Sequence, residues 1–164
     1  MQLRDATEAD LAALVSIYNG VIATSTAVFS SVPVTLEERR QWWRVRIAAG
    51  YPVLVAVDES GVLGFSTFGE FRSSPGYRFT VEHSVHVRSG CRGGGIGTKL
   101  LAALFPRAAA LGKHMMIAAV DAANAPSIRF HERLGFHQAG LLREVGHKFD
   151  RWLDLVFLQR RIGA

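Results

Sequence analysis

A run of glycines marks the point at which one stretch of the chain stops alternating like a strand and begins to repeat like a helix. The run is Arg92-Gly93-Gly94-Gly95-Ile96-Gly97, followed by Thr98. Glycine in a helix costs about 1 kcal/mol relative to alanine, so its presence here needs a compensating use. The first N–H groups of a helix are unpaired and carry about half a positive charge, and glycines let a phosphate approach them. With the charged donor of Arg92, the run predicts a pyrophosphate site.

The glycine run does not fit two other phosphate-binding motifs. A Walker loop would end in Gly-Lys-Ser/Thr, and here only Thr98-Lys99 follows. A dinucleotide fingerprint needs an acidic residue about 20 positions further on, whereas Val120-Asp121 belongs to a different strand-to-loop unit. From the glycines alone, a flexible surface turn remains an open alternative.

Two titratable side chains are candidates for proton transfer. Glu82 falls in residues 78–87, where alternation puts it on one strand face with Thr80, Ser84 and His86. A carboxylate among Val and Phe would have a raised pKa, as a general base requires, although an ordinary exposed strand glutamate is the alternative. His131 can donate a proton near neutral pH, and a packing histidine is the alternative.

The elements that must position these residues follow from periodicity and capping signals. Thr7-x-x-Asp10 and Thr35-x-x-Glu38 each predict a helix start, and residues 19–34 between these helices are expected to be irregular or partly helical. Later segments are predicted as a hairpin at 52–57 and 62–68, a strand at 78–87, a helix at 97–111, a strand at 114–120, a helix at 125–134 closed by Gly135, and strands at 136–142 and 152–158. The pattern predicts one α+β domain over residues 1–164, with a mostly antiparallel sheet flanked by helices and a central β-α-β-α segment.

Composition limits the classes of function. The chain has 164 residues, 49% hydrophobic and 20% charged, without an apolar run of the roughly 18 residues that span a membrane. The N-terminus does not resemble a signal peptide, and a single cysteine, Cys91, suits a reducing cytoplasm. The net charge of +5 suits a small anionic ligand, because the basic residues are scattered rather than clustered as in a nucleic-acid-binding module. The closest approach to a cluster, Arg39, Arg40, Arg44 and Arg46, is expected to be a solvated helix face.

Two motifs together resemble one enzyme superfamily. Arg92-x-x-Gly95-x-Gly97 between a strand and a helix resembles the acyl-CoA motif of the Gcn5-related N-acetyltransferases (GNAT), and residues 124–136 resemble their Asn-x-x-Ser to Leu-Gly-Phe segment. Blocks at 23–29, 50–56, 80–87 and 146–152 resemble the phosphinothricin / methionine sulfoximine acetyltransferases over nearly the whole chain. The resemblance implies a GNAT fold, acetyl-CoA as cosubstrate, no metal, a homodimer, and acetylation of the α-amino group of small amino acids.

The resemblance also implies roles for individual residues. Glu82 matches the family's proposed catalytic carboxylate, and His131 stands where many relatives place a tyrosine thought to protonate the leaving thiolate. The backbone of residues 85–87 is expected to contact the cofactor from a strand edge opened by a bulge. The expected cofactor residues are Val85, His86, Val87, Arg92, Gly93, Gly94, Gly95, Ile96, Gly97, Thr98, Asn124 and Ser127, with helix capping as the alternative for Asn124 and Ser127.

The acceptor site is predicted from the chemistry of an amino acid. A carboxylate calls for arginine, so Arg72 and Arg78 are candidate ligands, and Phe29 and Phe79 are candidate walls of the side-chain pocket beside Glu82. Core packing is the alternative for both phenylalanines. Lys148 and Trp152 are expected at a dimer interface or a neighbouring site. A polyamine, an aminoglycoside or a protein N-terminus is the alternative acceptor, and a sensor without catalysis is disfavoured by Glu82.

Overall fold

The strands of the chain form one seven-stranded sheet in the computed structural model, which describes residues 1–163. The elements in chain order are β1 (Gln2–Asp5), η1 (Glu8–Asp10), α1 (Leu11–Thr24), α2 (Leu36–Ala48), β2 (Val53–Asp58), β3 (Gly61–Glu70), η2 (Pro75–Tyr77), β4 (Thr80–Val87), α3 (Ile96–Ala110), β5 (Met115–Asp121), α4 (Ala125–Arg133), β6 (His137–Lys148) and β7 (Arg151–Arg161). The strand order is β1-β2-β3-β4-β5-β7-β6, and every neighbouring pair is antiparallel except β4–β5. The predicted mixed, mostly antiparallel α+β fold is confirmed.

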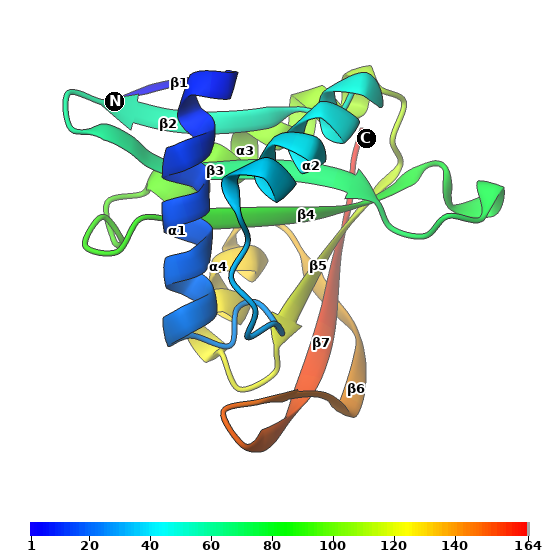
Figure 1. The fold of residues 1–164 in the computed structure, drawn as a ribbon. Coiled ribbons are helices and arrows are strands. Elements are labelled where there is room, and N and C mark those ends of the chain that lie inside the picture. Colours follow the sequence, from blue (N-terminus) through cyan, green and yellow to red (C-terminus); the bar gives the residue numbers. More distant parts are fainter. Residues whose placement is uncertain (164) are drawn as a thin grey trace.

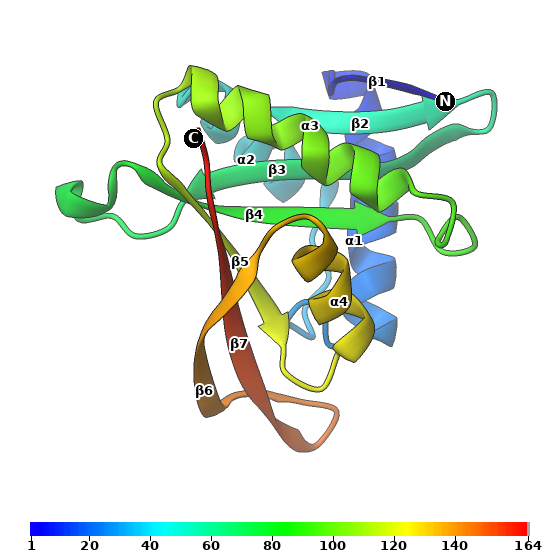
Figure 2. The same ribbon diagram turned by 180° about the vertical axis from the view of Figure 1, so that it is seen from behind.

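Helices cover both faces of the sheet. Figure 1 shows α1 and α2 in front of one face, and the reverse view in Figure 2 shows α3 and α4 in front of the other. The larger core joins Leu100 and Leu104 of α3 to Phe68, Met116 and Phe136, whereas a second core lies under α1 and α2 (Leu11, Leu14, Val53, Phe65). The hairpin of β6 and β7 projects from the opposite end of the molecule to α3 (Figure 2).

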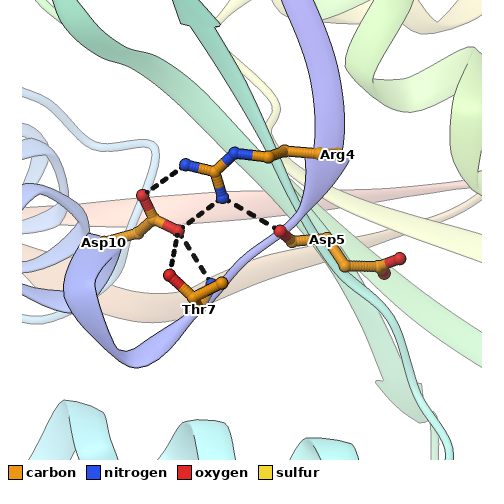
Figure 3. A network of polar contacts seen from close by, with 4 residues as sticks. All are labelled: Arg4, Asp5, Thr7 and Asp10. Carbon is orange, nitrogen blue, oxygen red and sulfur yellow. Dashed lines mark hydrogen bonds and ion pairs between the residues drawn. The ribbon is translucent and has the colours of Figure 1, made fainter.

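The connection from β1 to α1 is fixed by a compact polar network (Figure 3). The Arg4 guanidinium donates to both carboxylate oxygens of Asp10, at 2.7 and 2.8 Å, and the backbone N–H of Thr7 donates to the same carboxylate at 2.8 Å. These donors favour the ionised carboxylate, Arg4 most of all, and lower the pKa of Asp10 to about 2. The start of α2 carries the predicted capping box, in which Thr35 Oγ1 accepts from the backbone N–H of Glu38 at 3.2 Å.

The structure differs from the sequence-based expectations in several places. Strand β1 was not predicted, and helix α1 continues to Thr24, into the segment expected to be partly helical. Strands β6 and β7 extend further than predicted, to Lys148 and Arg161. Gly135 has the left-handed φ of 81° expected of a residue that closes a helix. Arg39 is only 5% exposed, so the expectation of a solvated arginine face on α2 is wrong at that position.

Candidate active site

The sheet opens between its two parallel strands. β4 and β5 pair only through Thr80–Glu82 and Met115–Ile117, after which the two strands diverge, as Figure 2 shows. The register of β3 with β4 has no shift from Gly64 to Glu70, so the opening comes from this divergence. The expectation that a bulge in β4 opens the edge is therefore wrong. Backbone N–H and C=O groups of two strand edges are left facing one cleft.

The cleft between the diverging strands has a volume of about 610 Å³. It is lined by both strands, by the loop before α3, by α4 and by the end of α1. All but one of the residues predicted to bind the cofactor line it, namely Val85, His86, Val87, Arg92, Gly93, Gly95, Ile96, Gly97, Thr98, Asn124 and Ser127, and so does His131. The exception is Gly94, which does not line the cleft.

The glycine loop owes its composition to backbone conformation. Gly93 and Gly95 have φ values of 88° and 74°, in the left-handed region that glycine adopts at little cost. A Cβ built on either residue would meet no atom within 4 Å, so the space above the loop is open. Helix α3 begins at Ile96, and its first backbone hydrogen bond runs from the N–H of Lys99 to the carbonyl of Gly95. The preceding N–H groups therefore have no partner inside the helix, which suits an anionic ligand.

Glu82 lies at the apex of the opening, on the sheet face that α1 and α2 cover. His86 shares this face and contacts the ring of Tyr18, at 5.4 Å between centroids, as strand alternation predicts. Burial raises the pKa of the Glu82 carboxyl, and the positive charges of Arg72 and then Arg46 oppose that shift. The carboxylate is thus a stronger base than an exposed glutamate.

His131 has a fixed tautomer in its neutral form. Its side chain is 4% exposed, and its Nδ1 lies 2.7 Å from the carbonyl oxygen of Ser127. A carbonyl only accepts, so Nδ1–H is the donor, and the neutral ring carries its lone pair on Nε2. Burial lowers the pKa of His131, against the opposing effect of the Ser127 bond. Within residues 1–163, Nε2 has no hydrogen-bond partner, and neither ring nitrogen of the adjacent His83 has one.

Comparison with known proteins assigns this arrangement to a family. The acetyltransferase (GNAT) family model matches residues 14–136. This chain belongs to the GNAT acetyltransferase family. The L-methionine sulfoximine/L-methionine sulfone acetyltransferase of Pseudomonas aeruginosa is 49% identical over 158 residues, which cover 96% of this chain and 92% of that protein. The phosphinothricin N-acetyltransferase of Streptomyces coelicolor is 37% identical, with coverages of 98% and 95%.

A solved structure of a relative also has the same fold. The putative acetyltransferase yncA from Salmonella typhimurium, determined with its cofactor acetyl-CoA, superposes with a TM-score of 0.96. It is 42% identical, and the superposition covers 99% of this chain and 94% of that one.

In this GNAT acetyltransferase, the predicted acceptor residues are only partly brought together. Arg72 is exposed, stacks over the ring of Phe71 at 5.1 Å, and lies close enough to Glu82 to affect its pKa. Arg78 is engaged elsewhere, because it donates to the carbonyl of Pro75 and stacks over Phe79 at 4.4 Å. Neither Glu82 nor these arginines line the 610 Å³ cleft.

Asn124 and Ser127, for which helix capping was the alternative to cofactor binding, do form a helix cap. The Asn124 side-chain oxygen accepts from the backbone N–H of Ser127 at 3.1 Å, at the start of α4. Both residues also line the cleft, so capping and contact with a ligand are compatible.

Lys148 fixes the loop between α1 and α2 through hydrogen bonds that the sequence pattern did not predict. Lys148 is 2% exposed, and its Nζ donates to the carbonyls of Ser25 and Val28 at 2.7 and 2.8 Å. The ring of Phe29 packs on Gly146, which belongs to β6 like Lys148, and a Cβ at Gly146 would come within 2.3 Å of the Phe29 ring. Phe29 therefore anchors the loop to β6. Because Ser25 lines the cleft, Lys148 and Gly146 fix part of its wall.

Two arginines of α2 lie in environments that the charge pattern of the helix did not predict. Arg39 lies between the rings of Tyr18 and Trp42, at 4.3 and 4.5 Å from their centroids. Arg46 lies against Gly69 in β3 and close enough to Glu82 to affect its pKa. A charge pattern on a helix predicts a polar face, but it does not reveal that a distant glycine leaves room for one guanidinium.

The structure offers no feature of a membrane span or metal centre among the residues that it describes. Within residues 1–163, no helix is both long and apolar enough to cross a membrane. The same residues hold no group of three or more His, Cys, Asp or Glu side chains suited to a metal ion.

Proposed function

We propose that the chain is an acetyl-CoA-dependent N-acetyltransferase that acetylates the α-amino group of small amino acids such as L-methionine sulfoximine, L-methionine sulfone or L-phosphinothricin. The observation that carries the proposal is the cleft between β4 and β5, with the start of α3 among its lining and with Glu82 at the last residue pair before the two strands diverge. The relatives from P. aeruginosa and S. coelicolor, which are named as acetyltransferases of methionine sulfoximine, methionine sulfone and phosphinothricin, support the acceptor class.

The cleft fits acetyl-CoA in shape and chemistry. The unpaired N–H groups of α3, with Gly93, Gly95 and Arg92 beside them, suit the pyrophosphate. The backbone of residues 85–87 suits the amide groups of the pantetheine arm, because a strand edge pairs readily with an extended chain. Acetyl-CoA supplies the activated acetyl group, and the relative from S. typhimurium was solved with it.

In the proposed mechanism two residues move protons. The Glu82 carboxylate removes a proton from the acceptor ammonium, directly or through water, so that the neutral amine forms the new C–N bond. His131 Nε2 accepts the second amine proton and passes it to the sulfur as the C–S bond breaks. The Nδ1–H bond to Ser127 holds the ring orientation throughout. Glu82 then releases its proton to solvent, and His131 ends in the tautomer in which it began.

The proposal includes a cytoplasmic homodimer without a nucleic-acid or membrane partner. β6 is an edge strand, and its hairpin with β7 exposes Leu141, Leu142, Val145, Phe149 and Trp152 by 43–64%. An exposed apolar edge suits an isologous contact with a second copy. Val145→Glu should therefore lower the mass measured by light scattering from dimer to monomer, and a monomeric unmodified protein would contradict the dimer.

A thiol-release assay with acetyl-CoA tests the function. Methionine sulfoximine, methionine sulfone and phosphinothricin should be acetylated in preference to polyamines, aminoglycosides and a peptide N-terminus. Absence of turnover with every small amino acid would defeat the proposal. Glu82→Gln should lower kcat by about 10²-fold or more, whereas Glu59→Gln, in an exposed turn, should leave it unchanged. An unchanged kcat in Glu82→Gln would remove Glu82 from this role.

A further inference from the structure

The guanidinium of Arg46 lies where the side chain of another residue would be. A Cβ built on Gly69 would come within 1.3 Å of Arg46 Nη1 and 2.4 Å of its Cζ. Any side chain at position 69 would therefore displace the guanidinium. The absence of a side chain on Gly69, in a buried strand, leaves the space that Arg46 occupies.

This position places Arg46 beside the proposed general base. Gly69 and Glu82 are partners in the antiparallel pairing of β3 with β4. Side chains of such partners lie on one face, with their Cβ atoms about 4.5–5.5 Å apart. Arg46 Nη1 lies 1.3 Å from that Gly69 Cβ position, so its distance from the Glu82 Cβ is of the same order, to within this offset. Figure 1 shows that α2, the helix of Arg46, covers this part of the sheet.

Arg46 and Arg72 are the two cations whose charges act on Glu82, and both have free donors. Within residues 1–163, neither guanidinium takes part in an ion pair, and neither donates a hydrogen bond to a side chain or a backbone carbonyl. Aromatic rings hold them instead, Trp42 at 5.7 Å from Arg46 and Phe71 at 5.1 Å from Arg72. Each guanidinium has five N–H donors in a planar fork that matches a carboxylate.

From these contacts we propose that Arg46, together with Arg72, binds the α-carboxylate of the acceptor amino acid. The inference rests on the proposed function and names the group that selects amino acids over other amines. The amino and carboxylate groups of an amino acid share one carbon, so a carboxylate on Arg46 holds the amine near Glu82. Two guanidiniums also offset the two negative charges that Glu82 and the acceptor bring together. A polyamine would meet repulsion from the same pair.

The test compares an acceptor with and without its carboxylate. L-Methionine sulfoximine and its decarboxylated amine are assayed with Arg46→Gln, Arg46→Lys and the control Arg44→Gln, an exposed arginine of the same helix. Arg46→Gln should lower kcat/KM for the amino acid by about 10- to 100-fold and leave the amine unaffected or improved. Arg46→Lys should recover part of the loss, because it restores charge without the planar fork. The KM for acetyl-CoA should not change.

Gly69→Ala provides a second route to the same loss, with Gly20→Ala as a control because a Cβ there meets nothing within 4 Å. Equal losses on both acceptors, or full activity in Arg46→Gln, would overturn the inference. Calorimetric binding of L-methionine sulfone in the presence of CoA separates this inference from the proposed function. If the wild type shows no turnover but binds methionine sulfone more tightly than Arg46→Gln does, the carboxylate site is supported and the proposed function is rejected. If the wild type does not bind methionine sulfone, the carboxylate site is rejected.

Discussion

Replacing Lys148 by methionine should loosen the wall of the cleft without unfolding the protein. The ammonium group makes two charge-assisted hydrogen bonds to the α1–α2 loop, at 2.7 and 2.8 Å. Each such bond contributes about 1.5–3 kcal/mol to stability, and removing the cost of burying the charge offsets part of the combined loss. Methionine keeps the apolar stem, so we expect a net loss of about 2–3 kcal/mol in the closed loop.

The loss should appear in acceptor kinetics and in loop exchange. If the closed loop forms the acceptor site, kcat/KM for the amino acid should fall by about 30- to 140-fold, since 1.4 kcal/mol corresponds to tenfold. The KM for acetyl-CoA should change less, because this loop contributes only Ser25 and Ala27 to the lining of the cleft. Hydrogen exchange of residues 25–29 should accelerate in Lys148→Met, and Lys113→Met, which removes a bond to the carbonyl of Arg78, should leave that segment unchanged.

An unchanged acceptor KM together with unchanged exchange in residues 25–29 would refute this reasoning. Lys148 would then be a packing residue of the β6–β7 hairpin. A fall in the unfolding midpoint as large in Lys113→Met as in Lys148→Met would likewise show that the loss is general.

Three further predictions follow from groups described above. Asp10→Asn should destabilise the fold by about 1–2 kcal/mol at pH 7. The fall in the pKa of Asp10 from 3.8 to about 2 corresponds to about 2.4 kcal/mol, and solvent screening at Arg4, whose side chain is 36% exposed, reduces this value. This contribution is present above pH 3.8 and disappears as pH falls through 2, so an equal loss by urea unfolding at pH 2 would contradict it. Gly94→Lys should preserve acetyl-CoA affinity in calorimetry, because a Cβ there meets nothing within 4 Å, whereas Gly95→Ala, at φ 74°, should weaken it. The acidic limb of kcat/KM should lie above 4.5, because burial raises the pKa of Glu82, and its persistence in Glu82→Gln would exclude this carboxyl as its source.

Local chemistry made part of the site predictable. The glycines before α3 are explained by the conformation of their own loop. Gly93 and Gly95 have left-handed φ values, which other residues adopt only at a cost in free energy. Alternation alone placed Glu82 and His86 on one face of β4, and the contact of His86 with Tyr18 agrees. Where the physical cause lies within about ten residues, the sequence pattern was sufficient.

Features that depend on distant partners were not predictable. Lys148 is buried because its ammonium meets carbonyls of residues more than 100 positions earlier. Arg46 is held where Gly69, in another strand, leaves space. Strand β1 has four residues, too few for a periodic signal, and forms because β2 offers an edge.

The short pairing between β4 and β5 has a mechanical consequence. Within residues 1–163, the strand pairing that joins β4 to β5, and so the block of β1 to β4 to the block of β5 to β7, is limited to Thr80–Glu82 and Met115–Ile117, with further bonds from the N–H groups of His114 and Met115 to the carbonyl of Phe79 just before it. The sheet thus has a hinge line, and the cleft lies along it. A molecule that bonds to both strand edges acts as a brace across this hinge. Saturation at 100 times Kd would add about 2.7 kcal/mol to the resistance of the whole molecule to unfolding. If acetyl-CoA occupies the cleft as proposed, its binding also resists the separation of the two blocks.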